Sequence, residues 1–99
     1  MKEELIRTEM LLGSAAVDRL AHAHVAVFGI GGVGGHVTEV LARSGVGELT
    51  LVDSDRVNLS NLNRQIIATH ETVGQNKVDA AADRIRSINP NCVVHTFPL

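Results

Sequence analysis

The chain of 99 residues has one cysteine, two prolines and two aromatic residues. The single cysteine, Cys92, excludes an internal disulfide, and we expect it to be a small buried core residue. Because Phe28 and Phe97 are the only aromatic residues, the core must be aliphatic. The five histidines have no recognisable ligand spacing, so with one cysteine we expect no structural zinc site.

The chain also has no large excess of positive or negative charge and no long apolar run. Nine Lys and Arg residues against eleven Asp and Glu residues give a formal charge of −2, which is no basic footprint for non-specific nucleic-acid binding. A few local contacts could still hold a nucleic acid. Without a signal peptide or an apolar run of about 18 residues, we expect a cytoplasmic protein with no membrane partner.

The apolar pattern predicts two short N-terminal helices, at residues 2–12 and 14–21, followed by an α/β region. Buried strands are expected at 25–28, 49–52 and 92–97, with helices after the first glycines and at 74–87. This order predicts a right-handed parallel βαβαβ unit, which is half of a Rossmann-type sheet. Residues 1–23 form the predicted helical, dimer-contacting segment, and 24–99 the N-terminal part of a truncated nucleotide-binding domain. Such a half needs another surface to cover it, so we expect a homodimer or a marginally stable domain.

A glycine-rich loop follows the first predicted strand and opens a helix. Gly29, Gly31 and Gly34 have the Gly-x-Gly-x-x-Gly spacing, with Gly32 between them. Glycines let phosphate oxygens approach the backbone amides at the start of the helix. Asp53 ends the next strand 22 residues after Gly31, close to the distance of about 20 expected for a ribose-binding acid. A nucleotide site is therefore predicted, and the absence of Gly-Lys-Ser/Thr excludes a Walker P-loop.

The glycine loop alone would favour a dinucleotide such as NAD, but the polar stretch of residues 53–65 favours ATP. Asp55 could hold Mg²⁺ beside phosphates. Arg64 and Lys77 are two separated cations that could face the glycine loop and neutralise a triphosphate. Each of these residues, taken singly, could equally be a solvated or turn-forming side chain.

Taken together, these motifs resemble the ubiquitin-activating-enzyme-like superfamily, the ThiF/MoeB/HesA group. The resemblance covers about residues 5 to 95, and its most specific part is Asn-x-x-Arg-Gln followed by Gly-x-x-Lys. The matching segments are Gly29-Ile30-Gly31-Gly32-Val33-Gly34, Asp53-x-Asp55-x-Val57, Ser60-Asn61-Leu62-Asn63-Arg64-Gln65, Val73-Gly74-Gln75-x-Lys77 and Ile88-Asn89-Pro90.

The resemblance implies a role for each matching residue. Asp53 would bind the ATP ribose, and Asp55 is the weaker candidate for the Mg²⁺ shell. The phosphates would be contacted by Asn61, Arg64 and Lys77, with Gln65 beside them. Arg7 aligns with an arginine that dimers of this group insert into the partner's ATP site, although it could also be an ordinary surface arginine.

The resemblance leaves two substrates open, one from each of two branches of the superfamily. Four segments look most like the tRNA threonylcarbamoyladenosine dehydratase branch, namely residues 7–13, 29–34, 42–45 and 84–90. Enzymes of that branch use ATP to activate a carboxylate on a modified adenosine of tRNA, which then closes to a cyclic form. Ser60-Asn61-Leu62 looks more like the MoeB and ThiF branch, which activates the C-terminal glycine of a ubiquitin-like or sulfur-carrier protein.

The implied chemistry is adenylation, in which a carboxylate attacks the α-phosphorus of ATP and releases pyrophosphate. Family members also carry a metal-binding aspartate and a substrate-binding half further along the chain, so residues 1–99 alone are expected to be inactive or nearly so. An NAD-linked oxidoreductase and a non-catalytic, nucleotide-sensing dimerisation module are the alternatives from other classes.

Overall fold

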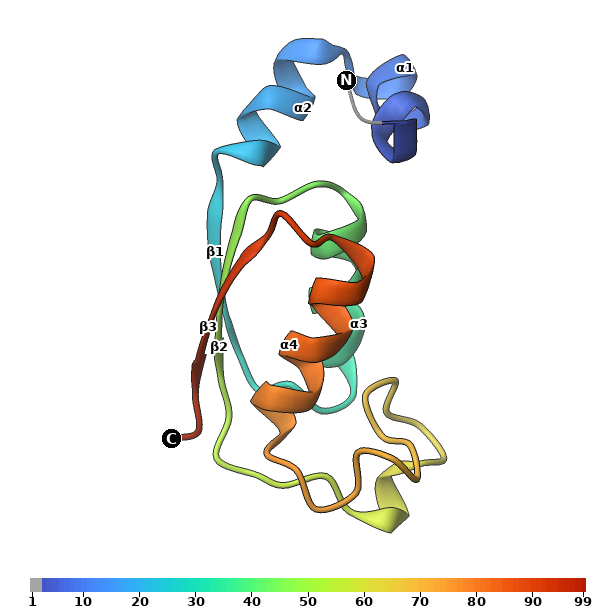
Figure 1. Ribbon diagram of the computed structural model, residues 1–99, viewed down its shortest axis with the longest axis vertical. Coiled ribbons are helices and arrows are strands. Elements are labelled where there is room, and N and C mark those ends of the chain that lie inside the picture. Colours follow the sequence, from blue (N-terminus) through green and yellow to red (C-terminus); the bar gives the residue numbers. More distant parts are fainter. Residues whose placement is uncertain (1–2) are drawn as a thin grey trace.

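In a computed structural model, which describes residues 3–99, three parallel strands lie beside helices packed on one face of the sheet (Figure 1). Lys2, where we expected the first helix to begin, lies outside the described residues. The elements in chain order are η1 (Glu3–Leu5), α1 (Ile6–Leu12), α2 (Ser14–Ala21), β1 (His24–Phe28), α3 (Val33–Arg43), β2 (Glu48–Val52), η2 (Leu59–Asn61), α4 (Lys77–Ile88) and β3 (Val93–Phe97).

The sheet has the order β1-β2-β3, with β2 in the middle. Glu48 pairs with His24 of β1, and Thr50 pairs with His95 of β3. Both connections run through a helix and both helices lie on the same side of the sheet, as Figure 1 shows. The arrangement confirms the Rossmann-type parallel βαβαβ half that the sequence predicts.

Aliphatic side chains fill the space between the sheet and the two helices. Val27, Leu49 and Leu51 point from the strands into this space. Val78 and Ile85 of α4 pack against the same core, and at most 1% of the surface of each is exposed. Cys92 joins the same core at 6% exposure, and its burial raises the pKa of the thiol. Cys92 is therefore the core residue that the sequence predicts.

The opposite face of the sheet is open. Among residues 3–99 no helix lies over it, and it presents Phe28, Val93 and Phe97 with large exposed fractions. Parallel sheets are normally covered on both faces. The expectation that a further surface covers this half-sheet remains a prediction.

The two ends of the molecule differ in character. At one end α1 packs mainly against α2 and η1, so these segments project along the long axis of 41 Å. At the other end lie the carboxyl ends of the strands and the long loop between β2 and α4. The longest helix of residues 3–99, α4, has 12 residues, and none of the helices in that range could cross a membrane.

Candidate functional site

The glycine loop occupies the turn from β1 into α3. The backbone at Gly32 has φ of +57°, a conformation that favours glycine. A side chain at Gly34 would overlap the carbonyl oxygen of Gly29, so only glycine allows the first turn of α3 to pack this closely on the end of β1. The amide of Gly34 donates to the carbonyl of Gly31 at 3.2 Å, and the other amides at the start of α3 are held at the carboxyl edge of the sheet, where they can face an anion.

Asp53 connects this loop to the end of β2. Its Oδ2 accepts a hydrogen bond from the backbone amide of Ile30 at 2.7 Å, and its Oδ1 accepts one from the amide of Asp55 at 2.8 Å. Each carboxylate oxygen retains a second lone pair. The position at the end of the second strand is the one from which an acid reaches a nucleotide ribose in Rossmann-type sites.

Lys77 is the first residue of α4 and is 93% buried, since only 7% of its surface is exposed. We expected the helix to begin at about Gly74, which is wrong by three residues. Gly74 has φ of +93°, and Asn76 forms an isolated bridge with Arg56, so the chain becomes helical only at Lys77. The backbone amide of Lys77 also donates to the carbonyl of Asp55 at 2.9 Å, which fixes the start of the helix.

The ammonium group of Lys77 lies directly beside the glycine loop. A Cβ placed on Gly31 would be 3.1 Å from Lys77 Nζ and 2.9 Å from Gln65 Nε2. Lys77 Nζ also lies 3.9 Å from Asp55 Oδ2, in an ion pair whose aspartate side chain is 70% exposed. The structure thus brings together four of the predicted site residues, Gly31, Gln65, Lys77 and Asp55.

Gln65 and Asn61 are buried polar residues of the loop between β2 and α4. Gln65 Oε1 is buried without a hydrogen-bond partner among the described residues. Asn61 is 6% exposed, and its Oδ1 accepts from the backbone amide of Asn58 at 2.8 Å in a capping box at η2. The Nδ2 group of Asn61 remains a free donor in this set of hydrogen bonds, so it can serve a bound ligand.

Two of the predicted cations lie away from this cluster. Arg64 is exposed, and its guanidinium donates to the carbonyl of Ser60 and to Asn63 Oδ1 rather than facing the glycine loop. Arg7 is on α1, at the opposite end of the molecule from the glycine loop in Figure 1. Arg7 therefore cannot reach the site of its own chain.

Arg56, which was not among the predicted site residues, helps to hold the site together. Its guanidinium donates to the carbonyl of Gly74 at 2.9 Å, and this closes the loop just before Lys77. A lone arginine in a polar loop carries no sequence signal for such a role.

The candidate site lies at the carboxyl edge of the sheet (Figure 1). A separate cavity of about 770 Å³ lies at the other end of the molecule and is lined by Leu5, Val17 and Ile88 among others. At the glycine loop, backbone amides, the buried ammonium of Lys77 and the carboxylate of Asp53 come together at the carboxyl edge of the sheet. This combination is suited to hold a nucleotide with its phosphates against the loop.

Comparisons with known proteins agree with this geometry. The model of the ThiF family matches residues 5–99. A tRNA threonylcarbamoyladenosine dehydratase from Bacillus subtilis (strain 168) is 48% identical over 94 residues, covering 95% of this chain and 37% of the relative. A molybdopterin-synthase adenylyltransferase from Salmonella typhimurium is 47% identical over 77 residues, covering 78% and 31%.

A solved structure, the E. coli tRNA N6-threonylcarbamoyladenosine dehydratase TcdA in complex with ATP, superposes with a TM-score of 0.95 at 44% identity. It covers 98% of this chain and 40% of that protein. The chain thus spans between three and four tenths of the length of these relatives. The matched residues include the glycine loop, Asp53 and Lys77, and the chain belongs to the ThiF family.

Proposed function

We propose that the chain forms the ATP-binding part of an enzyme that adenylates a carboxylate. The observation that carries this proposal is the buried ammonium of Lys77, which lies so close to the glycine loop that a Cβ placed on Gly31 would be 3.1 Å from it, beside the start of α3. A buried cation at such a loop needs a negative partner, and exposed Asp55 at 3.9 Å is only a weak one. The relatives named adenylyltransferase and the relative solved with ATP support the same chemistry.

The proposed role of Asp53 is to hold the ribose. Both of its oxygens already accept backbone amides, so the carboxylate is fixed in place before the nucleotide arrives. The second lone pairs accept the ribose hydroxyls. Such preorganisation lowers the ordering cost of binding.

The phosphates are assigned to the polar residues around Gly31. Lys77 and the Nδ2 group of Asn61 supply donors from the buried side, and Gln65 lies beside them. Arg64 would have to leave its bonds to Ser60 and Asn63 to reach a phosphate, which is a rotation of an exposed side chain. Arg7 would act in the site of a second copy of the chain.

Mg²⁺ fits this site only together with the nucleotide. Asp55 offers one exposed carboxylate, and both oxygens of Asp53 already accept amides. The one cluster of three potential metal ligands in residues 3–99 contains neither aspartate. Since Mg²⁺ is commonly held by one or two carboxylates plus phosphate oxygens, Asp55 would share the ion with ATP, and the ion would supply charge neutralisation on the phosphates.

In the proposed reaction a carboxylate oxygen forms a bond to the α-phosphorus, and the bond from the α-phosphorus to the bridging oxygen of the β-phosphate breaks. Pyrophosphate leaves and an acyl-adenylate remains. Charge that builds on the leaving phosphates is stabilised by Lys77, Arg64 and the amides of the loop. Holding the two reactants in line supplies much of the remaining rate enhancement, so no general base is required from these residues.

For the substrate we propose the carboxylate of a threonylcarbamoyl-modified adenosine in tRNA. The relative from Bacillus subtilis that bears this name is 48% identical and covers 95% of the chain. The second candidate, the C-terminal glycine of a ubiquitin-like or sulfur-carrier protein, is favoured by the Ser60-Asn61-Leu62 segment and by the adenylyltransferase relative.

ATP binding by the chain is tested by calorimetry with ATP and with NAD⁺, using wild type and Lys77→Met. We expect ATP to bind and the Lys77→Met variant to lose at least about tenfold in affinity, because a charge-assisted contact is worth about 1.5–3 kcal/mol. Arg86→Met, which changes an exposed arginine in the last turn of α4, is the matched control. Binding of NAD⁺ in preference to ATP would favour an oxidoreductase instead.

Catalysis is tested by ATP–pyrophosphate exchange in a polypeptide of the length of its relatives that contains these 99 residues. Exchange that depends on modified tRNA supports the first substrate, and exchange that depends on a carrier protein supports the second. ATP binding without exchange under either condition would leave a nucleotide-sensing module.

A further inference from the structure

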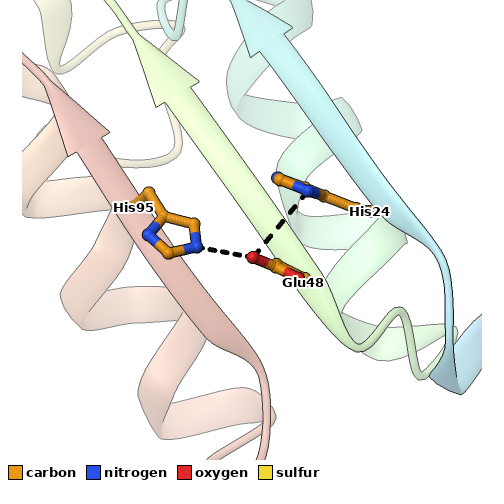
Figure 2. A group of neighbouring side chains, drawn as sticks. All are labelled: His24, Glu48 and His95. Carbon is orange, nitrogen blue, oxygen red and sulfur yellow. Dashed lines mark hydrogen bonds and ion pairs between the residues drawn. The ribbon is translucent and has the colours of Figure 1, made fainter.

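A cluster of three side chains on the open face of the sheet has the composition of a metal site. His24 of β1, Glu48 of β2 and His95 of β3 project from neighbouring strands toward one another (Figure 2). One ligand atom from each lies within 4.8 Å of the other two. We propose that these three residues bind a divalent transition-metal ion such as Zn²⁺, independently of the nucleotide site.

The strand register places the three residues on one face. His24 pairs directly with Glu48, and His95 pairs with Thr50, the next residue on the same face of β2. Because side chains alternate between the faces of a strand, the three point to the same side. They come from hydrogen-bonded strands, so the backbone that carries them is rigid.

The present distances are close to those of a coordinated ion. His95 Nε2 lies 2.6 Å from Glu48 Oε2, and His24 Nδ1 lies 3.8 Å from the same oxygen. Ligand atoms around tetrahedral zinc lie about 3.3 Å apart, given bonds of about 2.0–2.1 Å. To hold an ion, small side-chain rotations would have to lengthen the distance from His95 to Glu48 and shorten the distance from His24 to Glu48.

The second nitrogen of His24 is already engaged as it would be in a metal site. His24 Nε2 lies 2.6 Å from Thr50 Oγ1, which can accept the ring proton. In the tautomer in which Nε2 carries that proton, Nδ1 has a free lone pair 3.8 Å from Glu48 Oε2 and is available to a cation between the two groups. In metal-bound histidines the N–H of the other ring nitrogen almost always donates to an oxygen acceptor, and here the Thr50 hydroxyl would be that acceptor.

The ligand types and their exposure decide which ion fits. Two imidazole nitrogens and one carboxylate favour zinc and its neighbours over Mg²⁺ or Ca²⁺, which prefer oxygen ligands alone. The side chains of His24, Glu48 and His95 are 49%, 38% and 44% exposed, so water can complete a four-coordinate shell. Thr50 would act as a positioning residue through His24.

The test is a titration of the chain, purified without a histidine tag and stripped of metal, with Zn²⁺ by calorimetry and with Co²⁺ by visible absorption. We expect one ion per chain and the absorption typical of tetrahedral Co²⁺. His95→Ala and Glu48→Gln should each weaken binding about tenfold or more, and Thr50→Val about tenfold, since loss of a supporting hydrogen bond alone costs about 10–100-fold. Circular dichroism verifies that each variant remains folded.

His70→Ala is the matched control, because His70 is an exposed histidine in the loop between β2 and α4. Its affinity should equal that of wild type. The proposal is overturned by the absence of saturable Zn²⁺ binding at micromolar metal, or by unchanged affinity in both His95→Ala and Glu48→Gln. A loss of the bound ion in His70→Ala would likewise overturn it by placing the ion elsewhere.

Discussion

At the residue scale, Gly34 shows how a backbone contact specifies an amino acid. Any Cβ at this position would overlap the carbonyl oxygen of Gly29, and neither backbone segment can move freely because Gly29 directly follows β1 and Gly34 lies in the first turn of α3. We expect Gly34→Ala to lower the free energy of unfolding by about 2–3 kcal/mol, as in overpacked cores.

Urea unfolding measures this loss. His36→Ala, an exposed change on the same helix, is the control and should alter stability by less than about 0.5 kcal/mol. An equal stability of Gly34→Ala and wild type would show that the loop can relax, and the close packing of α3 on β1 would then not require glycine.

Residue by residue, the sequence predicted the place of the glycine loop and of Asp53 better than it predicted the contacts around them. The glycine spacing and the distance to Asp53 together are typical of a strand, a tight turn and a helix followed by an acid at the end of the next strand. This part of the site could therefore be anticipated. The hydrogen bond from Ile30 to Asp53 and the burial of Gln65 depend on how the loop folds back, which no local pattern encodes. No sequence pattern indicated the proposed metal site, because His24, Glu48 and His95 are far apart along the chain and meet only through strand register.

At the element scale, the strands and helices were predictable from their apolar periodicity, whereas their ends were not. The start of α4 was expected at Gly74 and lies at Lys77, because the bridge between Arg56 and Asn76 extends the loop. That shift has a functional consequence. It makes Lys77 the first helical residue and directs a buried ammonium toward the glycine loop.

The loop between β2 and α4 depends on the capping box at η2. Replacing Asn61 with Ala leaves the amide of Asn58 without its acceptor, and we expect a loss of about 1–2 kcal/mol in urea unfolding. Ser60→Ala, an exposed neighbour whose side chain makes no hydrogen bond among those described, should leave stability unchanged.

A second variant separates this structural role from the proposed phosphate contact. Asn61→Asp retains the Oδ1 acceptor but removes the Nδ2 donor, so stability should be kept while ATP affinity falls about tenfold. If Asn61→Asp binds ATP as wild type does, Asn61 serves the loop alone.

At the scale of the whole molecule, the N-terminal helices are the feature with least support from their own chain. Met10 and Leu11 of α1 are 81% and 83% exposed, and α1 packs mainly on α2 and η1. On α3, Val33 and Val40 are also largely exposed. Apolar surfaces of this kind are typical of protein–protein contacts, which is why we expect the homodimer that the N-terminal segment 1–23 predicts.

The dimer is also what would give Arg7 a function, since it lies at the end of the molecule opposite its own glycine loop. Light scattering over a range of concentrations should give the mass of two chains for wild type. Leu11→Glu should give one chain, because an isologous contact places the new charge against its own symmetry copy. Glu9→Gln on the same helix is the control and should remain dimeric. A wild-type chain that stays monomeric at high concentration would remove the role proposed for Arg7 but would leave ATP binding at Lys77 untouched, because every other residue of the candidate site comes from one chain.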